Sequence, residues 1–528
     1  MSLRRRSGVL VPLFSAPSRR SWGIGEISDI AHLAAWLREA GQHILQLLPL
    51  NEMASGTQSP YSAMSAMAID PIYIAMDDVA DFVEAGGWST LTGADRAAIE
   101  QARQAATVEY GRIRPVKERA LRTAFRHFAS AVSTRGSDRA AALAAFVERE
   151  SWWLADYALF RALHDREHGV AWMEWPEAVR RRDPAALAAT RDALADEVRY
   201  YEYVQWIASE QWDRARALAA SLDVALFGDL PFMVDLHSAD VWAHQADFHL
   251  DRSVGVPPDA FSATGQDWGM PAYNWPAFAE AGFAWLEDRA RRSAALFDGY
   301  RVDHLVGFYR TYSRPRDGQG DAAFAPADEH DQVALGERVL ALFRAPGAEI
   351  IAEDLGVVPD FVRRSLERMA VPGFRVFRWE REWDSEGQPF RDPADYPAVS
   401  VATTGTHDTE PLRTWWDQAG DDERRAVAAI PSIAALAPEG SLHEQPFVPH
   451  VRDVLVQALL GAQSAIVLFP IQDVFGWADR INEPATVSDR NWSYRLPWPV
   501  DQLGGEAEAV ERQRALREWA RACGRTDG

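Results

Sequence analysis

The sequence predicts an α/β protein built as a (β/α)8 TIM barrel, with helical and loop insertions between strands and no separate C-terminal β-domain. Short β-branched or apolar runs recur along the chain, and helical patterns separate them, which is the alternation typical of a parallel sheet. The runs are nearly continuous in apolar residues, as strands buried on both faces are. The eight runs are residues 8–14, 43–50, 224–229, 297–303, 349–354, 374–380, 400–408 and 465–473.

The first strand-to-strand connection illustrates the helical signal. Apolar residues follow the i, i+3, i+4, i+7 spacing of a helix that buries one face. We expect Ser28 to cap its start and Gly41 to mark its end. The predicted buried stripe consists of Ile30, Leu33, Ala34 and Leu37.

Two connections are too long for a single crossover helix. Residues 75–223 carry Ala-, Arg- and Glu-rich helical patterns, which predict a mostly helical insertion over about 75–200 whose last helix rejoins the barrel. Residues 233–296 have weaker periodicity and contain a Gly- and Pro-rich loop, which predicts an active-site loop region over about 233–290. We therefore expect residues 1–528 to form one catalytic barrel with two insertions.

Composition limits the partners and the compartment. Hydrophobic residues make up 47% of the chain and charged residues 25%, the balance of a globular protein with a large core. The formal net charge of −22 repels phosphate backbones and anionic lipid, so no nucleic-acid or membrane partner is expected. Cys523 is the only cysteine, which favours a reducing compartment and hence the cytoplasm. The sequence carries no signal of oligomeric state.

Acidic residues follow most of the predicted strands. In a parallel barrel the carboxyl ends of all strands meet on one face, so these groups are expected to ring one cleft. Each acid taken alone could instead cap the next helix. Paired carboxylates serve glycosidic chemistry, and a ring of acids also serves metal-assisted enolate chemistry; the interleaved aromatics favour the first. The acids are Asp229, Asp303, Glu353, Asp354, Glu380, Asp408 and Asp473.

Three segments resemble the catalytic segments of a known family. GYRVDHLVGF (299–308), IIAEDLGVVP (350–359) and TGTHDTE (404–410) are similar, in order and spacing, to those of the amylomaltases, 4-α-glucanotransferases related to the α-amylase clan. GVPPDAFSATGQDWG (255–269) and RINEPATVSDRNWSYRLP (480–497) resemble amylomaltases in particular. The likeness extends from about residue 8 to 498.

The resemblance implies roles for individual residues. Asp303 would be the nucleophile, Glu353 the general acid/base, and Asp408 the carboxylate that binds sugar hydroxyls and helps distort the ring. Arg301 lies two residues before Asp303, hence on the same face of the strand, where its charge would keep that carboxylate ionised. Glu353 must carry a proton at neutral pH, which requires neighbouring anions and poor solvation.

The same resemblance implies a set of substrate-binding residues. His304 and His407 would bind hydroxyls, and Tyr61 would form a platform under the sugar at the cleavage point. Two positions depart from the common family pattern: Ala260 stands where many members have tyrosine, which leaves Phe261 as the aromatic of that loop, and Ala485 stands where glycine is common. The further residues expected to bind or shape the glucan path are Asp229, Gln266, Trp268 and Asn482.

The expected activity is retaining transfer of an α-1,4-glucan segment from a donor maltooligosaccharide or starch to the 4-hydroxyl of an acceptor glucose or glucan. No cofactor and no metal are expected. A retaining α-glucan hydrolase is the alternative closest in chemistry. A non-catalytic glucan-binding barrel and a metal-dependent lyase are the alternatives from other classes.

Overall fold

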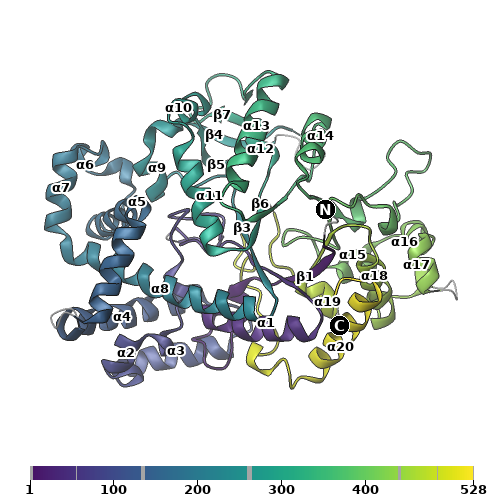
Figure 1. The fold of residues 1–528 in the computed structure, drawn as a ribbon, viewed down its shortest axis with the longest axis horizontal. Helices are drawn as coiled ribbons and strands as arrows, with labels where there is room; N and C mark the ends of the chain where they lie inside the picture. The colour runs from purple at the N-terminus through teal and green to yellow at the C-terminus, as the bar shows by residue number, and fades with distance from the viewer. Residues whose placement is uncertain are drawn as a thin grey trace.

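A closed barrel of parallel strands forms the centre of the computed structural model, which describes residues 4–54, 56–132, 137–258, 265–437, 442–484 and 486–526 (Figure 1). The strand order around the barrel is β1-β12-β11-β10-β9-β6-β3-β2. Each of the eight predicted runs overlaps one barrel strand, so the (β/α)8 prediction is confirmed. The strands are β1 (Arg6–Leu10), β2 (Ile44–Gln46), β3 (Ala225–Leu230), β6 (Gly299–Val302), β9 (Glu349–Ala352), β10 (Gly373–Val376), β11 (Ser400–Thr403) and β12 (Ile466–Pro470).

Helices occupy the connections between the strands. α1 (Ile30–Glu39) joins β1 to β2. The long connection from β2 to β3 holds α2 (Ala80–Glu84), α3 (Gly93–Gln104), α4 (Tyr110–His127), α5 (Asp138–Arg166), α6 (Glu177–Arg180), α7 (Pro184–Ala193) and α8 (Ala195–Ser221). In Figure 1, α2 to α7 gather in a lobe at the left, and α8 leads from it to the barrel. We propose that this lobe is the inserted subdomain.

The remaining helices follow the later strands. Between β3 and β6 lie α9 (Ala239–Ala243), α10 (Trp275–Glu280) and α11 (Ala284–Leu296), and between β6 and β9 lie α12 (Val306–Tyr309) and α13 (Glu329–Arg344). The rest are α14 (Asp360–Met369), α15 (Leu412–Gln418), α16 (Asp421–Ala428), α17 (Pro431–Leu436), α18 (Pro449–Leu460), α19 (Ile471–Phe475) and α20 (Ala507–Ala522). After β12, residues 471–484 and 486–526 form helices, turns and irregular segments without a strand.

Helix α1 buries the predicted stripe of Ile30, Leu33, Ala34 and Leu37. The predicted Ser28 cap is wrong. A 3₁₀ turn over Ile27–Asp29 precedes the helix, and a reciprocal capping box between Glu26 and Asp29 fixes that turn. The backbone N–H of Glu26 donates to Asp29 Oδ2 at 2.7 Å, so the acidic pair satisfies the free amides that a serine would otherwise have served.

A second, antiparallel sheet covers part of the barrel mouth where the sequence predicted loop. Its order is β5-β4-β7-β8. The pairing of β4 with β5 contains register shifts, and such bulges break the period-2 pattern by which a strand is recognised in sequence. At Gly255 a Cβ would overlap the carbonyl oxygen of Gln266, so the close approach of these strands requires glycine. The strands are β4 (Phe248–Val256), β5 (Gln266–Tyr273), β7 (Thr311–Pro315) and β8 (Ala323–Ala325).

The barrel interior is packed by a small cluster separate from the larger core between strands and helices. One side chain comes from each of β2, β3, β9, β10 and β11, and two come from β12. Since side chains alternate across a strand, residues two positions further along point up the same axis toward the carboxyl ends of the strands. The cluster consists of Ile44, Phe227, Ile351, Phe374, Val401, Ile466 and Leu468.

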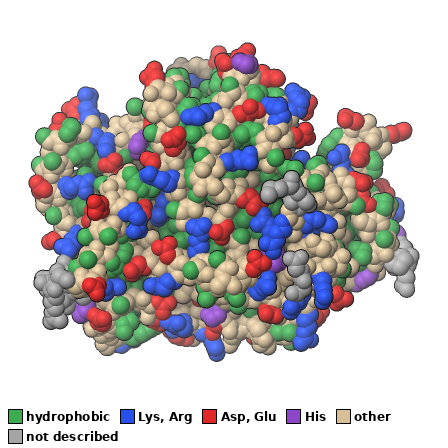
Figure 2. Space-filling model, viewed as in Figure 1, with side chains coloured by type: hydrophobic (Ala, Val, Ile, Leu, Met, Phe, Trp, Pro, Cys, Tyr) green, Lys and Arg blue, Asp and Glu red, His purple; other side chains and the backbone are tan. Residues whose placement is uncertain are grey.

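The surface carries charges of both signs. Figure 2 shows acidic and basic side chains interspersed over this face, although the formal net charge is −22. Within the described residues, no helix combines the length and the apolar character needed to cross a lipid bilayer.

Candidate active site

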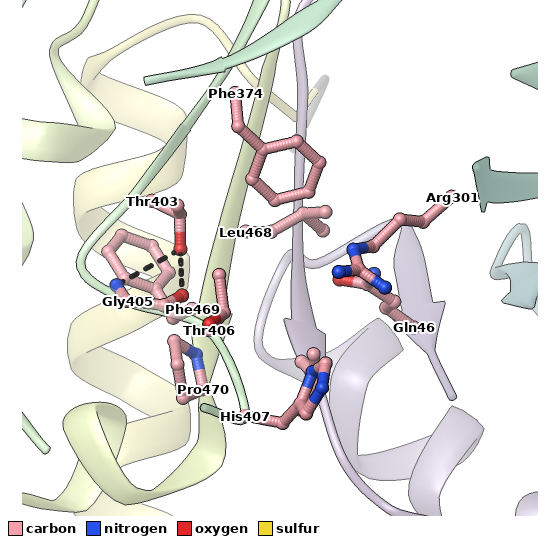
Figure 3. A pocket seen from close by; sticks show the side chains of 11 residues that line it. Gln46, Arg301, Phe374, Thr403, Gly405, Thr406, His407, Leu468, Phe469 and Pro470 are labelled. Carbon is pink, nitrogen blue, oxygen red and sulfur yellow. Dashed lines mark hydrogen bonds between the residues drawn. The ribbon is translucent and has the colours of Figure 1, made fainter. Parts of the chain in front are cut away.

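Strand alternation brings the predicted residues together above the barrel core. Asp229 follows Phe227 by two residues and Glu353 follows Ile351 by two, so both carboxylates point toward the barrel axis. Figure 3 shows a small pocket that shares Arg301 and His407 with the site: Arg301 projects into it from one side, and Thr403 lies on the other.

The site itself is a cavity of about 650 Å³. Ten of the predicted residues line it, whereas Asp229 lies behind Arg301 and Tyr61 and contacts both without lining the cavity. Phe261, Ala260 and Ala485 lie outside the described residues. The predicted residues that line the cavity are Tyr61, Gln266, Trp268, Arg301, Asp303, His304, Glu353, His407, Asp408 and Asn482.

Three of the strand-end acids do not reach the cleft, so the predicted ring is only partly correct. Asp354 follows Glu353 and therefore points to the opposite face of the strand, where it accepts a hydrogen bond of 2.7 Å from the amide of Phe374. Glu380 follows a 3₁₀ turn that redirects the chain after β10. Asp473 accepts from Thr404 Oγ1 and from the amide of the first residue of α15, and so holds the architecture.

Arg301 is the electrostatic centre of the site and is 3% exposed. Its Nη1 donates to both oxygens of Asp229 at 2.8 Å. Its Nη2 lies 2.9 Å from Asp303 Oδ1 and 3.6 Å from Glu353 Oε2. One guanidinium thus fixes three carboxylates through its planar fork. Because Asp303 and Glu353 contact the same nitrogen, the two carboxylates are held next to each other, and retaining glycosidases use a close pair of carboxylates.

Burial raises the pKa of Glu353 to about 7. The negative charges of Asp303 and Asp408 contribute to this rise, while Arg301 and a backbone hydrogen bond from His304 oppose it. That bond, from the His304 amide to Glu353 Oε2, is 2.6 Å long. His304 has a φ of 41°, in the left-handed region that non-glycine residues rarely adopt, so the backbone is strained where it holds Glu353.

Asp408 is held on the opposite side of the cleft. Its Oδ1 accepts a hydrogen bond of 2.7 Å from Asn482 Nδ2, and its Oδ2 lies 3.3 Å from His407 Nε2. Although burial acts to raise it, the charge and hydrogen bond of His407, the hydrogen bond of Asn482 and the charge of Arg301 lower the pKa of Asp408 to about 2. Asp408 is therefore an anion at neutral pH. Gly405 permits this tight loop, since a Cβ there would overlap Thr409 Oγ1.

Aromatic rings wall the cavity. Tyr61 stacks on His407 with ring centroids 5.2 Å apart and an angle of 18° between the planes. Its hydroxyl donates to Asp229 Oδ2 at 2.7 Å, which fixes the ring. On the other side Trp268 meets His304 edge to face at 4.9 Å, and burial lowers the pKa of His304 to about 4. A neutral His304 and flat rings suit a ligand that is uncharged and bears hydroxyl groups.

Two functional contacts escaped the sequence reasoning, although both residues lie in the 480–497 segment that carried the resemblance. Arg480 Nη2 donates to the backbone carbonyl of Asp408 at 2.7 Å. Trp492 packs against the rings of Tyr61 and His407 with centroids 5.6 and 5.7 Å away. Its φ of 61° is unusual for tryptophan, but backbone angles leave no trace in a single sequence.

Comparison with known proteins agrees with this geometry. The model of the family described as 4-alpha-glucanotransferase matches residues 11–501. The chain belongs to the 4-α-glucanotransferase family. The 4-alpha-glucanotransferase of Thermus thermophilus is 34% identical over 97% of this chain and 100% of its own, and that of Synechocystis sp. is 33% identical over 95% of each. The amylomaltase of Streptococcus agalactiae, solved in complex with acarbose, has a TM-score of 0.82 at 26% identity, covering 99% of this chain and 100% of that one.

Family membership confirms the resemblance predicted from the motifs. The protein is an enzyme, a 4-α-glucanotransferase that acts on glucans, with the barrel that the family shares. A non-catalytic glucan-binding barrel and a metal-dependent lyase are thereby excluded.

Proposed function

We propose that the enzyme transfers α-1,4-glucan segments by double displacement, with Asp303 as nucleophile and Glu353 as general acid and base. The observation that carries this assignment is the shared contact of Asp303 and Glu353 with Arg301 Nη2, at 2.9 and 3.6 Å. Asp303 is paired directly with the cation, which orients its carboxylate for attack. Glu353 has a pKa raised by burial to about 7, so it exchanges a proton near neutral pH.

In the first step an oxygen of Asp303 attacks the anomeric carbon of the donor, and Glu353 gives its proton to the glycosidic oxygen as that bond breaks. The products are a β-linked glucosyl ester on Asp303 and a departing glucan with a new 4-hydroxyl. In the second step Glu353 takes the proton from the 4-hydroxyl of the acceptor, whose oxygen displaces Asp303. Two inversions at the same carbon restore the α-linkage.

The other residues of the cleft hold the sugar. Asp408 stays ionised, with a pKa of about 2, and is oriented by Asn482, so it can accept hydrogen bonds from the hydroxyls of the ring at the cleavage point. Tyr61 supplies a flat surface there, and Trp268 and Gln266 border the cavity from the antiparallel sheet. We expect acarbose, which the Streptococcus agalactiae amylomaltase binds, to compete with glucan for this cleft.

We further propose that donor and acceptor are maltooligosaccharides or starch and glucose or glucan, and that the enzyme works in the cytoplasm. The single cysteine, Cys523, supports a reducing compartment.

Incubation with maltotriose alone tests the proposal. Transfer should give glucose together with maltopentaose and longer chains, with little net increase in reducing ends. Asp303→Asn, which retains the shape of the side chain, is the matched control and should give no lengthened product. Accumulation of only glucose and maltose by the unmodified enzyme would instead establish a hydrolase.

A further inference from the structure

Two exposed tryptophans lie on one short segment beside the active site. Of the 21 tryptophans of the chain, Trp379 is 43% exposed and Trp383 is 61% exposed, whereas the rest are buried or half-buried. Neither ring packs on another aromatic ring of the described part of the chain. Exposing an indole ring to water is unfavourable in free energy. Two exposed indoles on one segment therefore indicate a surface that binds a ligand.

The segment that carries them, residues 377–391, is a well-anchored hairpin. Arg381 and Phe390 form an antiparallel bridge, and the amide of Glu382 donates to the carbonyl of Pro389 at 2.9 Å. The guanidinium of Arg381 lies 3.8 Å from the centroid of the Phe390 ring, which stacks on Phe377 at 6.0 Å. The exposed rings therefore stand on a fixed support, so little conformational entropy is lost when they bind a ligand.

The base of the 377–391 hairpin contacts the loop that carries Asp408. Arg378 Nη1 donates to Glu410 Oε1 at 2.7 Å, and its Nη2 donates to the carbonyl of Thr404 at 3.2 Å. β10 lies between β9, which leads to Glu353, and β11, which leads to Asp408. The hairpin thus rises from the catalytic rim of the barrel between the two strands that supply these carboxylates. In Figure 1 the green segment between α14 and α15 projects at the upper right.

The hairpin is nevertheless not part of the cleft, because no residue of 377–391 is among those that line it. The two tryptophans are four residues apart, so their Cα atoms are separated by at most about 14 Å. A single short stretch of polymer leaving the cleft over this rim could contact both.

We propose that Trp379 and Trp383 form an outer platform that binds α-1,4-glucan beyond the sugars held in the cleft, so that long glucans bind more tightly than short ones. This inference rests on the proposed function, since the occupant is a further part of the same substrate. Indole faces stack on the apolar faces of sugar rings, and the nearby side chains of Glu382, Asp384 and Arg381 offer partners for hydroxyls. The acidic tip disfavours an anionic polymer or an anionic membrane.

The test compares substrates of two lengths on the full-length enzyme. Trp379→Ala, Trp383→Ala and the double variant should leave kcat and KM for maltotriose within twofold of the parent. For transfer from amylose to glucose, the double variant should raise KM on the order of tenfold at unchanged kcat, the size expected for loss of two stacking contacts. Trp383→Phe, which keeps an aromatic ring, should retain most of the affinity for amylose that Trp383→Ala loses. Leu218→Ala, which removes an exposed apolar side chain on α8, is the matched control and should change neither KM.

Direct binding separates this proposal from failure of the proposed function. In an Asp303→Asn background, where turnover is blocked, amylose should quench the fluorescence of the exposed tryptophans, and the double variant should lose most of that quenching. Three results with the double variant would each overturn the platform proposal. They are an unchanged KM for amylose, an equal loss of activity on maltotriose and on amylose, and a change of oligomeric state. Absence of lengthened products from maltotriose with the unmodified enzyme would instead refute the proposed function itself.

Discussion

Arg301 and Asp303 form an ion pair of 2.9 Å between Nη2 and Oδ1; Arg301 lies on β6, and Asp303 directly follows the last residue of that strand. The pair couples the proposed nucleophile to the rest of the site, because the same guanidinium also contacts Asp229 and Glu353. The orientation of the nucleophile is therefore set by its place directly after β6 and by one planar cation.

Replacing Arg301 by lysine should separate charge from geometry. An ammonium group keeps the positive charge but cannot contact three carboxylates through a planar fork. Misplacement of a reacting group by about 1 Å can cost about 100-fold in rate, so we expect kcat/KM to fall by two to three orders of magnitude. The measurement is disproportionation of maltotriose, with a thermal melt as control for folding. Activity within threefold of the parent would show that charge alone is required.

The covalent intermediate should be found on Asp303. Glu353→Gln removes the proton donor, yet it should still accept an activated donor whose leaving group needs no proton, such as a glucosyl fluoride. Because the second step also lacks its base, the glycosyl-enzyme should accumulate. Peptide mass spectrometry should locate the added hexose on the peptide that contains Asp303. An adduct on any other residue would overturn the assignment.

The pH dependence of the first step should follow Glu353. That step requires the protonated acid, and burial raises its pKa to about 7, so kcat/KM for maltotriose should decline above pH 7 with unit slope. A glucosyl fluoride donor needs no protonation, so its kcat/KM should lack this decline. If the same decline appears with both donors, the titrating group is not the acid of the first step.

The barrel strands were predictable because each is a run of apolar residues long enough to stand out from its flanks. The strand-end positions of Asp303 and Glu353 were predictable for the same reason, whereas their roles were implied by the resemblance of the motifs that contain them. The antiparallel sheet was not, because bulges between β4 and β5 and the glycine at 255 interrupt the alternation.

Contacts between segments far apart in the chain could also not be predicted from the sequence. Asp354 and Asp473 sit at strand ends as the cleft acids do, but one faces away from the axis and the other accepts the first amide of α15. Arg480 and Trp492 reach the Asp408 loop from a segment more than 70 residues further along the chain, and nothing local predicts where that segment packs.

Glu353 should also make the protein less stable as pH rises. A carboxyl whose pKa is raised from 4.5 to about 7 by burial binds its proton more tightly in the folded state than in the unfolded chain. Its favourable contribution is complete below pH 4.5 and is lost as pH rises through 7. Glu353→Gln carries no charge at any pH, so its melting temperature should rise relative to the parent between pH 4.5 and 8 and then level off. Parallel melts of the two proteins from pH 4 to 9 measure this difference, in which the titration of other groups cancels.

Asp408→Asn is the contrasting variant. Asp408 has a lowered pKa of about 2, so its own contribution to stability is already complete at pH 4.5 and does not change in this pH window. A constant difference between Glu353→Gln and the parent from pH 4 to 9 would show that folding does not shift the pKa of Glu353.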